Sequence, residues 1–468
     1  MIFNSFQFIL IYPFLFLLYY AIPASWKTAR NVFLLVLSYA LYICWKPVYA
    51  LILLAVTLST YFTARMLKGS RHRKAIAVTG TLLSLSPLLF FKYFNFINDN
   101  ISKAFLYIGI DIHMSDLSLV APVGISFFTF QALGYLFDVY YRRIEEERNF
   151  LIYALFVSFF PSIVSGPINK ASSLIPQIRS LRPYFDYTKA VEGMKMLLWG
   201  MFMKVVLADR ASIYVIFILN NYTSHNGATC ALALLFYTFQ IYADFAGYSL
   251  MAIGVGKTLG FDLLENFRRP FFSYSVTDFW RRWHISLGLW LKDYVYIPLG
   301  GSRCSKSRNY FNIIVTFLVS GIWHGANWTY VVWGLLHGLA QVVEKMLGQQ
   351  KCNYGPFGRG VKILITFLFI NFSFIYFRMP TLTDAWALTL KIFDFSQPMG
   401  LTIDIPSVSF TLFAIILLLI KEVCDEFTNI RAFHSRHVAV RWCTYAIVLS
   451  SILLAGVFGA DQFIYANF

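Results

Sequence analysis

The sequence has little charge for its length. Asp, Glu, Lys and Arg make up 13% of its 468 residues, whereas hydrophobic residues make up 58%. Soluble globular proteins carry about a quarter charged residues and are about half apolar. Several apolar runs also reach the roughly 18–20 residues that cross a bilayer. The composition therefore excludes a soluble domain and predicts an all-α polytopic membrane protein.

Acidic residues are especially scarce. The chain has 23 Asp and Glu against 39 Lys and Arg, which gives a formal net charge of +16. Such a balance is found in proteins that bind nucleic acid. It is also found in membrane proteins whose cytoplasmic loops are basic. The hydrophobic composition favours the second explanation, so we predict contact with membrane lipid and no nucleic-acid partner.

Motifs for metal or hydrolase chemistry are missing. The six cysteines include no C-x-x-C pair, so neither a zinc site nor a disulfide framework is predicted. The sequence also lacks the H-E-x-x-H and G-x-S-x-G motifs, and no metal ion is expected. The N-terminus lacks a basic leader region and a clear cleavage site, so we expect residues 6–22 to be retained as a first span.

Twelve apolar segments are candidate spans or re-entrant helices. They are 6–22, 31–46, 48–65, 75–97, 117–138, 150–166, 194–220, 229–256, 310–346, 361–378, 406–422 and 440–458. Basic residues follow the first, third and fifth segments, and the alternate gaps carry few. The positive-inside rule then places the N-terminus in the periplasm. Without a repeat or a soluble segment, a single membrane domain over residues 1–468 is predicted.

The segment 278–296 is both aromatic and charged, and its spacing predicts an amphipathic helix. Its apolar stripe consists of Trp280, Trp283, Leu287, Trp290, Leu291 and Tyr294. The opposite face offers Arg282, Ser286 and Asp293 at helical spacing. Such a helix is expected to lie in the membrane interface or to re-enter the protein.

A polar motif interrupts the long apolar run 310–346. It reads S-G-I-W-H-G-A-N-W at 320–328 and centres on His324. The run is too long for one straight span, and Gly321 and Gly325 favour a kink or close helix packing. A desolvated imidazole stays neutral and can act as a general base. The alternative is a structural histidine that bonds a backbone carbonyl, and this alternative is favoured for His337.

A second histidine, His284, lies in F-W-R-R-W-H at 279–284. It is surrounded in sequence by Arg281, Arg282, Lys292 and Arg303. A cationic cluster at a membrane face suits the phosphates of a lipid or of a nucleotide-bearing donor. A solvated patch that faces lipid headgroups would have the same composition, and both explanations stay open.

Two polar residues, Gln240 and Asp244, lie four residues apart within an apolar run. A carboxylate there needs a partner, and a basic residue from 268–282 is expected to supply it. The pair is either catalytic or an ion pair that fixes helix packing. Lys204, Asp209 and Arg210 are predicted to be interface charges.

Taken together, these motifs resemble the membrane-bound O-acyltransferase family. The resemblance is closest to its bacterial branch of alginate O-acetylation and teichoic-acid D-alanylation proteins. It rests on F-W-R-R-W-H-I-S-L at 279–287, D-Y-V-Y-I-P-L-G-G-S-R at 293–303 and the motif at 320–328. Further matches are P-V-G-I-S-F-F-T-F-Q at 122–131, S-G-P-I at 165–168 and E-N-F-R-R-P-F at 265–271. The signature core covers about 91–347, and Leu250 departs from the Asp that often follows G-Y-S.

The resemblance implies a fold and a site. The fold would be a ring of roughly 11–13 transmembrane and re-entrant helices around a funnel that crosses the bilayer. His324 would be the catalytic base or acyl relay, and His284 its proton-sharing partner. The further candidates for donor binding or tunnel lining are Trp323, Asn327, Arg281, Arg282, Lys292, Asp293, Gln240 and Asp244.

The resemblance also implies substrates and partners. Acetyl-CoA would donate from the cytoplasm at the bacterial inner membrane. The acetyl group would pass to a periplasmic serine-esterase-like acetyltransferase or a small membrane partner, and so to a cell-envelope or secreted polysaccharide. Alginate, cellulose and peptidoglycan are all candidate acceptors. Three alternatives remain: transfer of D-alanyl or another acyl group, transport of a lipid-linked sugar, and a scaffold that recruits a periplasmic enzyme.

Overall fold

A computed structural model of the chain describes residues 3–111, 115–117, 120–180, 185–348, 355–394, 396, 400–402, 404–428 and 430–458. These residues form helices and connecting loops and no strand, so the predicted all-α class is confirmed. Within this described part of the chain, six helices are long and apolar enough to cross a membrane, which supports a multi-pass membrane protein. They are Pro47–Met66, Arg73–Tyr107, Gly227–Thr258, Pro356–Arg378, Ile405–Phe427 and Val438–Ala455.

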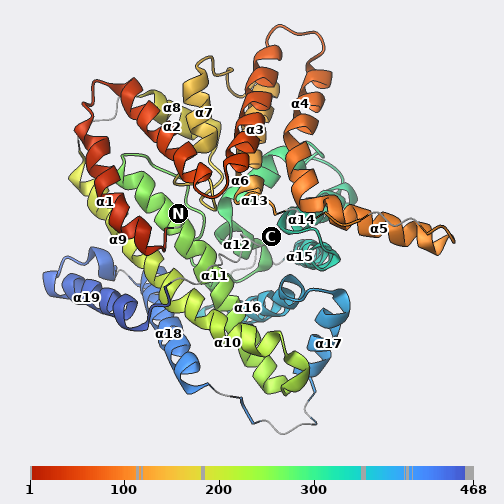
Figure 1. Ribbon diagram of the computed structural model, residues 1–468. Helices are drawn as coiled ribbons and strands as arrows, with labels where there is room; N and C mark the ends of the chain where they lie inside the picture. Colours follow the sequence, from red (N-terminus) through yellow and green to blue (C-terminus); the bar gives the residue numbers. More distant parts are fainter. Residues whose placement is uncertain are drawn as a thin grey trace.

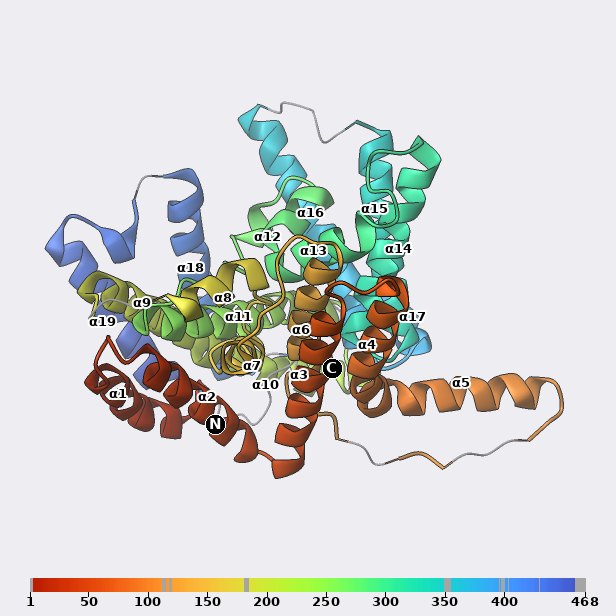
Figure 2. The same cartoon turned by 90° about the horizontal axis from the view of Figure 1, so that it is seen from above.

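The N-terminal helices form one side of the molecule (Figure 1). They are α1 (Phe6–Ala21), α2 (Lys27–Ile43), α3 (Pro47–Met66), α4 (Arg73–Leu88) and α5 (Phe94–Tyr107). A π-helical turn, Leu89–Tyr93, joins α4 to α5, and α5 extends away from the body (Figure 2). The expected span 75–97 is therefore longer and bent, with Pro87 just before the π-helical turn.

Helix α11 (Gly227–Thr258) forms the buried centre. The helix α9 (Tyr187–Met201), the π-helix Phe202–Ala208 and α10 (Asp209–Leu219) pack directly on it. Before them in the chain come α6 (Ile125–Tyr140), α7 (Phe150–Ser158) and α8 (Ala171–Arg179). Glycines let α9 and α11 approach closely. A Cβ on Gly200 would lie 2.6 Å from the Gly247 carbonyl oxygen, and one on Gly247 would lie 2.8 Å from that of Gly200.

Asp244 of α11 finds its partner in this contact, and the prediction of a partner from 268–282 is wrong. Lys204 Nζ lies 2.7 Å from Asp244 and 2.6 Å from Asp209. All three side chains are buried, so the prediction of interface charges is also wrong for Lys204 and Asp209. The sequence could not show this, because the three residues come together only when α11 packs on the π-helix.

We expect Lys204→Met to lower the free energy of unfolding by about 3–5 kcal/mol, because it leaves two buried carboxylates without their cation. Thermal unfolding of the purified protein in detergent measures this loss. The matched control is the triple variant Lys204→Met, Asp209→Asn, Asp244→Asn, which removes all three charges and should lose less. A single variant as stable as the unmodified protein would contradict this role for the cluster.

The segment 278–296 is not one continuous helix. It forms α12 (Val276–Arg282), α13 (Ile285–Leu291) and a π-helical turn, Lys292–Tyr296. The break falls at Trp283 and His284, where His284 adopts the left-handed conformation with φ 44°. A non-glycine residue is uncommon in this conformation and often marks a functional site. The apolar stripe and the polar face predicted for 278–296 are therefore interrupted at His284.

The run 310–346 forms a helical hairpin. Helix α14 (Lys306–His324) and α15 (Trp328–Met346) are joined by a short turn at 325–327. Gly321 and Gly334 face each other across the hairpin, and a Cβ at Gly321 would collide with the Tyr330 carbonyl. The glycines thus allow close packing, and the expected kink is a reversal of the chain. The chain ends with α16 (Pro356–Arg378), α17 (Leu382–Ile392), α18 (Ile405–Phe427) and α19 (Val438–Ala455).

Polar contacts gather the basic loops at one end of the molecule. Lys68 pairs with Glu146 at 2.8 Å and Lys170 pairs with Asp293 at 2.5 Å. Arg143 donates to the Asp293 carbonyl at 3.4 Å. Further contacts join the same end: Arg269 and Arg282 with Glu426, Val276 with Glu344, and Lys345 with Asn309. His324 lies at the opposite end of α14 from Lys306 and Arg308.

Candidate active site

His324 is the last residue of α14, and aromatic rings enclose it. Its side chain is 2% exposed. The ring centroids of Trp323, Trp333 and Phe377 lie 5.0, 5.0 and 5.2 Å from its own. The helix ends there because Gly325 is extended and Asn327 begins α15, accepting from the Thr329 N–H at 3.0 Å. The hairpin turn therefore fixes the direction of the imidazole.

A small cavity of about 20 Å³ adjoins His324. Its lining includes Trp323, Lys92, Ser126 and Phe127. Lys92 Nζ donates to the Trp323 carbonyl at 2.7 Å and lies 3.4 Å from Ser126 Oγ. The cavity is about the size of one water molecule. His324 thus lines a cavity together with the Lys92 amine and the Ser126 hydroxyl.

His284 is fully buried between α12 and α13 and is held by Asn266. Its Nδ1 lies 3.2 Å from Asn266 Oδ1. The same oxygen accepts from the Ser286 N–H at 3.2 Å and from Ser286 Oγ at 2.9 Å. The amide nitrogen of Asn266 donates to Ser249 Oγ at 3.0 Å. Both ends of the Asn266 amide are therefore assigned by their partners.

This network fixes the tautomer of His284. Asn266 Oδ1 can only accept, so Nδ1 of His284 must carry the proton. Nε2 is then an unprotonated acceptor, and it has no hydrogen-bond partner among the described residues. Buried polar atoms are usually paired, and an exception calls for an explanation. A proton donor on a substrate would supply the missing partner.

The two histidines are neighbours. Their ring centroids lie 6.4 Å apart, at an interplanar angle of 60°. Ring nitrogens at this separation are at least about 4 Å apart, which is too far for a direct hydrogen bond. One oxygen atom placed between them could reach both rings. Phe127 and Trp323 also contact His284, with centroid distances of 6.2 and 5.6 Å.

Of the other predicted site residues, Trp323 alone shows ring contacts with both histidines within the described part of the chain. Asn327 is next to the site but caps α15 and donates to the Pro380 carbonyl at 2.6 Å. Gln240 is buried in α11, and Asp244 pairs with Lys204.

The predicted donor-binding cluster is divided. Arg282 pairs with Asp278 at 3.1 Å and with Glu426 at 2.8 Å. Asp293 pairs with Lys170. Arg281 and Lys292 are exposed at the end that carries the basic loops. Arg282 and Asp293 are thus already committed to ion pairs that hold helices together.

Sequence reasoning did not single out three residues at this site: Asn266, Lys92 and Ser126. Asn266 lies in the E-N-F-R-R-P-F motif, but nothing in that motif says that its amide orients His284. Lys92 could have been identified from the sequence, because burial of a lysine inside the apolar run 75–97 costs free energy and such residues are usually functional. Ser126 gave none.

His337 forms a separate buried cluster. Its Nδ1 accepts from Trp280 Nε1 at 3.1 Å, and its Nε2 lies 3.0 Å from Ser373 Oγ. Both ring nitrogens are therefore used in joining α12, α15 and α16. This geometry fits the structural role favoured for His337.

A sequence model of the membrane-bound O-acyltransferase family matches residues 141–383. This match covers α12, α13 and the hairpin that carries both histidines. The chain belongs to the membrane-bound O-acyltransferase family.

Individual relatives of this chain carry names that refer to O-acetylation of alginate or of peptidoglycan. A protein named Probable alginate O-acetylase AlgI of Azotobacter vinelandii is 34% identical over 93% of this chain and 86% of the relative. One of the same name from Pseudomonas aeruginosa is 38% identical over 68% of this chain, and the match spans 60% of the relative. A Peptidoglycan O-acetyltransferase of Helicobacter pylori is 36% identical over 69% of this chain and 66% of its own length.

Proposed function

We propose that this protein takes an acetyl group from a cytoplasmic donor and passes it across the membrane for O-acetylation of a cell-envelope or secreted polysaccharide. The single observation that supports this most directly is the pair of buried histidines, with a bare Nε2 on His284 and a cavity beside His324. Family membership and the names of the relatives support the same class of reaction.

The proposed chemistry is direct acyl transfer. The neutral imidazole of His324 accepts the proton of an acceptor hydroxyl while the hydroxyl oxygen attacks the thioester carbonyl. The carbon–sulfur bond of the tetrahedral intermediate then breaks, and the imidazolium gives its proton to the departing sulfur. The products are the ester, free coenzyme A and the neutral imidazole. His284 would share this proton through Nε2, because Asn266 keeps Nδ1 protonated. Enclosure by aromatic rings excludes water and protects the acyl group from hydrolysis.

We propose acetyl-CoA as the donor and the bacterial inner membrane as the location. The end that carries the basic loops would face the cytoplasm, and the N-terminus would lie in the periplasm. His324 lies toward the opposite end of α14, where an acceptor from outside could reach it. A periplasmic serine-esterase-like acetyltransferase or a small membrane protein is the proposed immediate acceptor.

Purified protein incubated with acetyl-CoA, the partner protein and acceptor polysaccharide is expected to release free coenzyme A and to label the polymer or the partner. A thiol-reactive dye measures coenzyme A, and a radiolabelled acetyl group follows the acyl product. A preparation given acetyl-CoA without acceptor is the control for simple hydrolysis. A transporter or a scaffold would release no coenzyme A in either preparation, and that outcome would contradict the proposal.

A further inference from the structure

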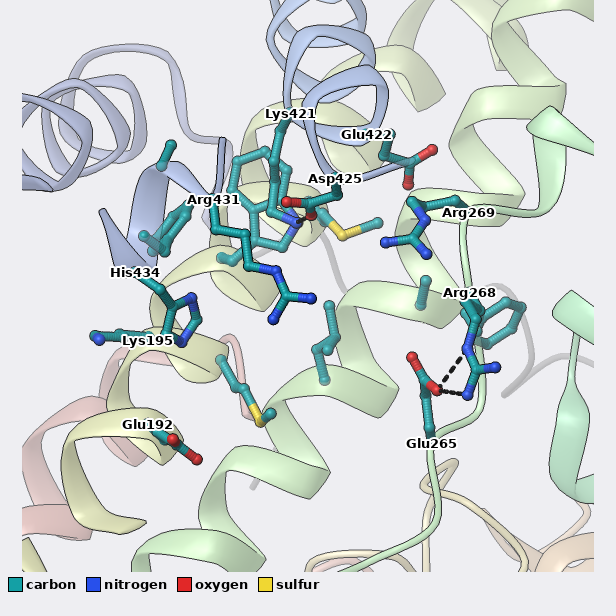
Figure 3. Close-up of a pocket in the computed structure, with 18 of the residues that line it drawn as sticks. Glu192, Lys195, Glu265, Arg268, Arg269, Lys421, Glu422, Asp425, Arg431 and His434 are labelled. Carbon is teal, nitrogen blue, oxygen red and sulfur yellow. Dashed lines mark hydrogen bonds and ion pairs between the residues drawn. The ribbon is translucent and has the colours of Figure 1, made fainter. Parts of the chain in front are cut away.

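A second, larger cavity lies at the end of the molecule that carries the basic loops. It has a volume of about 490 Å³ and lies between α9, α11, the segment 265–269 and α18 (Figure 3). Part of its wall comes from Lys421, Asp425 and Arg431, which lie beyond the family match at 141–383. We call it the α9–α18 pocket. It shares no lining residue with the cavity at His324.

Most charged side chains of the α9–α18 pocket are already neutralised. Their ion pairs are Arg268 with Glu265 at 2.5 Å, Arg269 with Glu426 at 2.7 Å, Lys421 with Asp425 at 2.6 Å, and Glu192 with Lys257 at 2.6 Å. Three charged lining residues form no ion pair among the described residues: Arg431, Lys195 and Glu422. Glu422 is a buried carboxyl that accepts a hydrogen bond from the Tyr242 hydroxyl. Outside the ion pairs, the pocket therefore has two cationic side chains, Arg431 and Lys195, and one buried carboxyl that is held by Tyr242.

The placement of these charges indicates the ligand. In Figure 3 the guanidinium groups of Arg431 and Arg269 extend toward the open middle from opposite walls, and Lys195 lies beside His434 at the rim. Burial and the charge of Lys195 lower the pKa of His434. His434 is therefore neutral, and Arg431 and Lys195 supply the positive charge for an anion. A guanidinium matches the oxygens of a phosphate.

Apart from the hydrogen-bonded pair of Tyr242 and Glu422, the deeper lining is apolar. Trp199, Met203, Ala246 and Leu250 lie below the charged rim. Trp199 stacks on Phe202 at a centroid distance of 4.8 Å, and Lys421 Nζ lies 5.1 Å from the Trp199 ring centre. A charged rim over an apolar floor fits an amphiphile better than a free phosphate ion. The volume is in the usual range for small-molecule sites, about 300–1,000 Å³.

We infer that the α9–α18 pocket binds a phosphate ester that carries an apolar or extended arm. Arg431 and Lys195 hold the phosphate, and the arm lies on Trp199 and Leu250. Two sources have this chemistry: an anionic phospholipid of the adjacent leaflet, and the phosphorylated pantetheine part of coenzyme A. Binding of either does not depend on the proposed acyl transfer.

The pocket also adjoins the catalytic region. Phe267 lines it, and the ring centroid of Phe267 lies 5.0 Å from Phe245 and 6.4 Å from His284. Phe245 in turn lies 4.6 Å from His284. A ligand in the pocket would therefore be separated from His284 by one aromatic layer.

Arg431→Gln tests the site, with Arg436→Gln as the matched control. Both arginines are exposed and follow α18, but only Arg431 lines the pocket. One measurement follows the binding of phosphatidylglycerol to delipidated protein by native mass spectrometry. The other measures binding of radiolabelled coenzyme A by equilibrium dialysis. We expect Arg431→Gln to weaken the binding of one of these two ligands by about 10-fold or more, as for loss of a charge-assisted contact.

The ligand whose binding Arg431→Gln weakens is the source of the phosphate. Lys195→Gln should weaken the binding of the same ligand, whereas Arg436→Gln should bind it as tightly as the unmodified protein does. The inference is overturned if neither ligand binds the unmodified protein, or if Arg431→Gln and Arg436→Gln bind both ligands equally. Coenzyme A release from acetyl-CoA, measured on the same preparations, tests the proposed function separately.

Discussion

His324→Ala is expected to lower the rate of acetyl transfer by about 10²–10⁴-fold, the usual contribution of a general base. The substitution removes an ionisable side chain that lines the cavity beside Lys92 and lies next to the His284 ring. The rate of coenzyme A release by purified protein measures the effect. Because substitution of a buried ring can also destabilise the fold, the rate is compared per folded molecule, counted by size-exclusion chromatography.

His337→Ala is the matched control for this prediction. His337 is as deeply buried as His324, and both rings contact Trp333, at centroid distances of 4.7 and 5.0 Å. His337 uses its nitrogens to join helices, so its loss should lower stability and leave turnover per folded molecule within a few-fold. If His324→Ala also kept its turnover within a few-fold, a structural role for His324 would be the better explanation.

Asn266→Leu is expected to reduce turnover by about 10²-fold or more, because His284 loses the acceptor that fixes its tautomer. The variant also leaves the Ser286 N–H and hydroxyl without an acceptor, which costs about 1–3 kcal/mol for each buried group. Steady-state rates and thermal unfolding together measure the two effects.

Asn266→Asp separates orientation from packing at this position. Aspartate has nearly the same shape and keeps an oxygen for His284 and Ser286, so we expect it to retain far more activity than leucine. An ionised carboxylate beside Nδ1–H would favour the protonated imidazole, so the acidic limb of the pH–rate profile should move to higher pH. Equal losses in both variants, with no shift of the profile, would show that Asn266 acts only in packing.

The sequence predicted the parts of this protein that depend on local pattern. The all-α class follows from composition and long apolar runs. His324 and His284 were chosen because an imidazole among tryptophans in an apolar segment is costly to bury. The reversal at 325–327 was partly visible, since Gly321 and Gly325 interrupt a run too long for one span.

The remaining features depend on contacts between distant segments. Nothing near Asp244 identifies Lys204 as its partner, because helix packing alone brings them together. The break at 283–284 was hidden because tryptophan, histidine and isoleucine carry no turn signal, and the left-handed conformation of His284 is imposed by contacts with Asn266 and the aromatic rings. The α9–α18 pocket likewise needs walls from both halves of the chain.

The most direct test of the account uses proteoliposomes with the acceptor polysaccharide and periplasmic partner enclosed and labelled acetyl-CoA added outside. With the basic loops facing outward, the unmodified protein should transfer label to the enclosed acceptor, and His324→Ala in the same orientation should transfer almost none. Transfer by His324→Ala at the unmodified rate would contradict the central claim that this imidazole carries acyl transfer across the membrane.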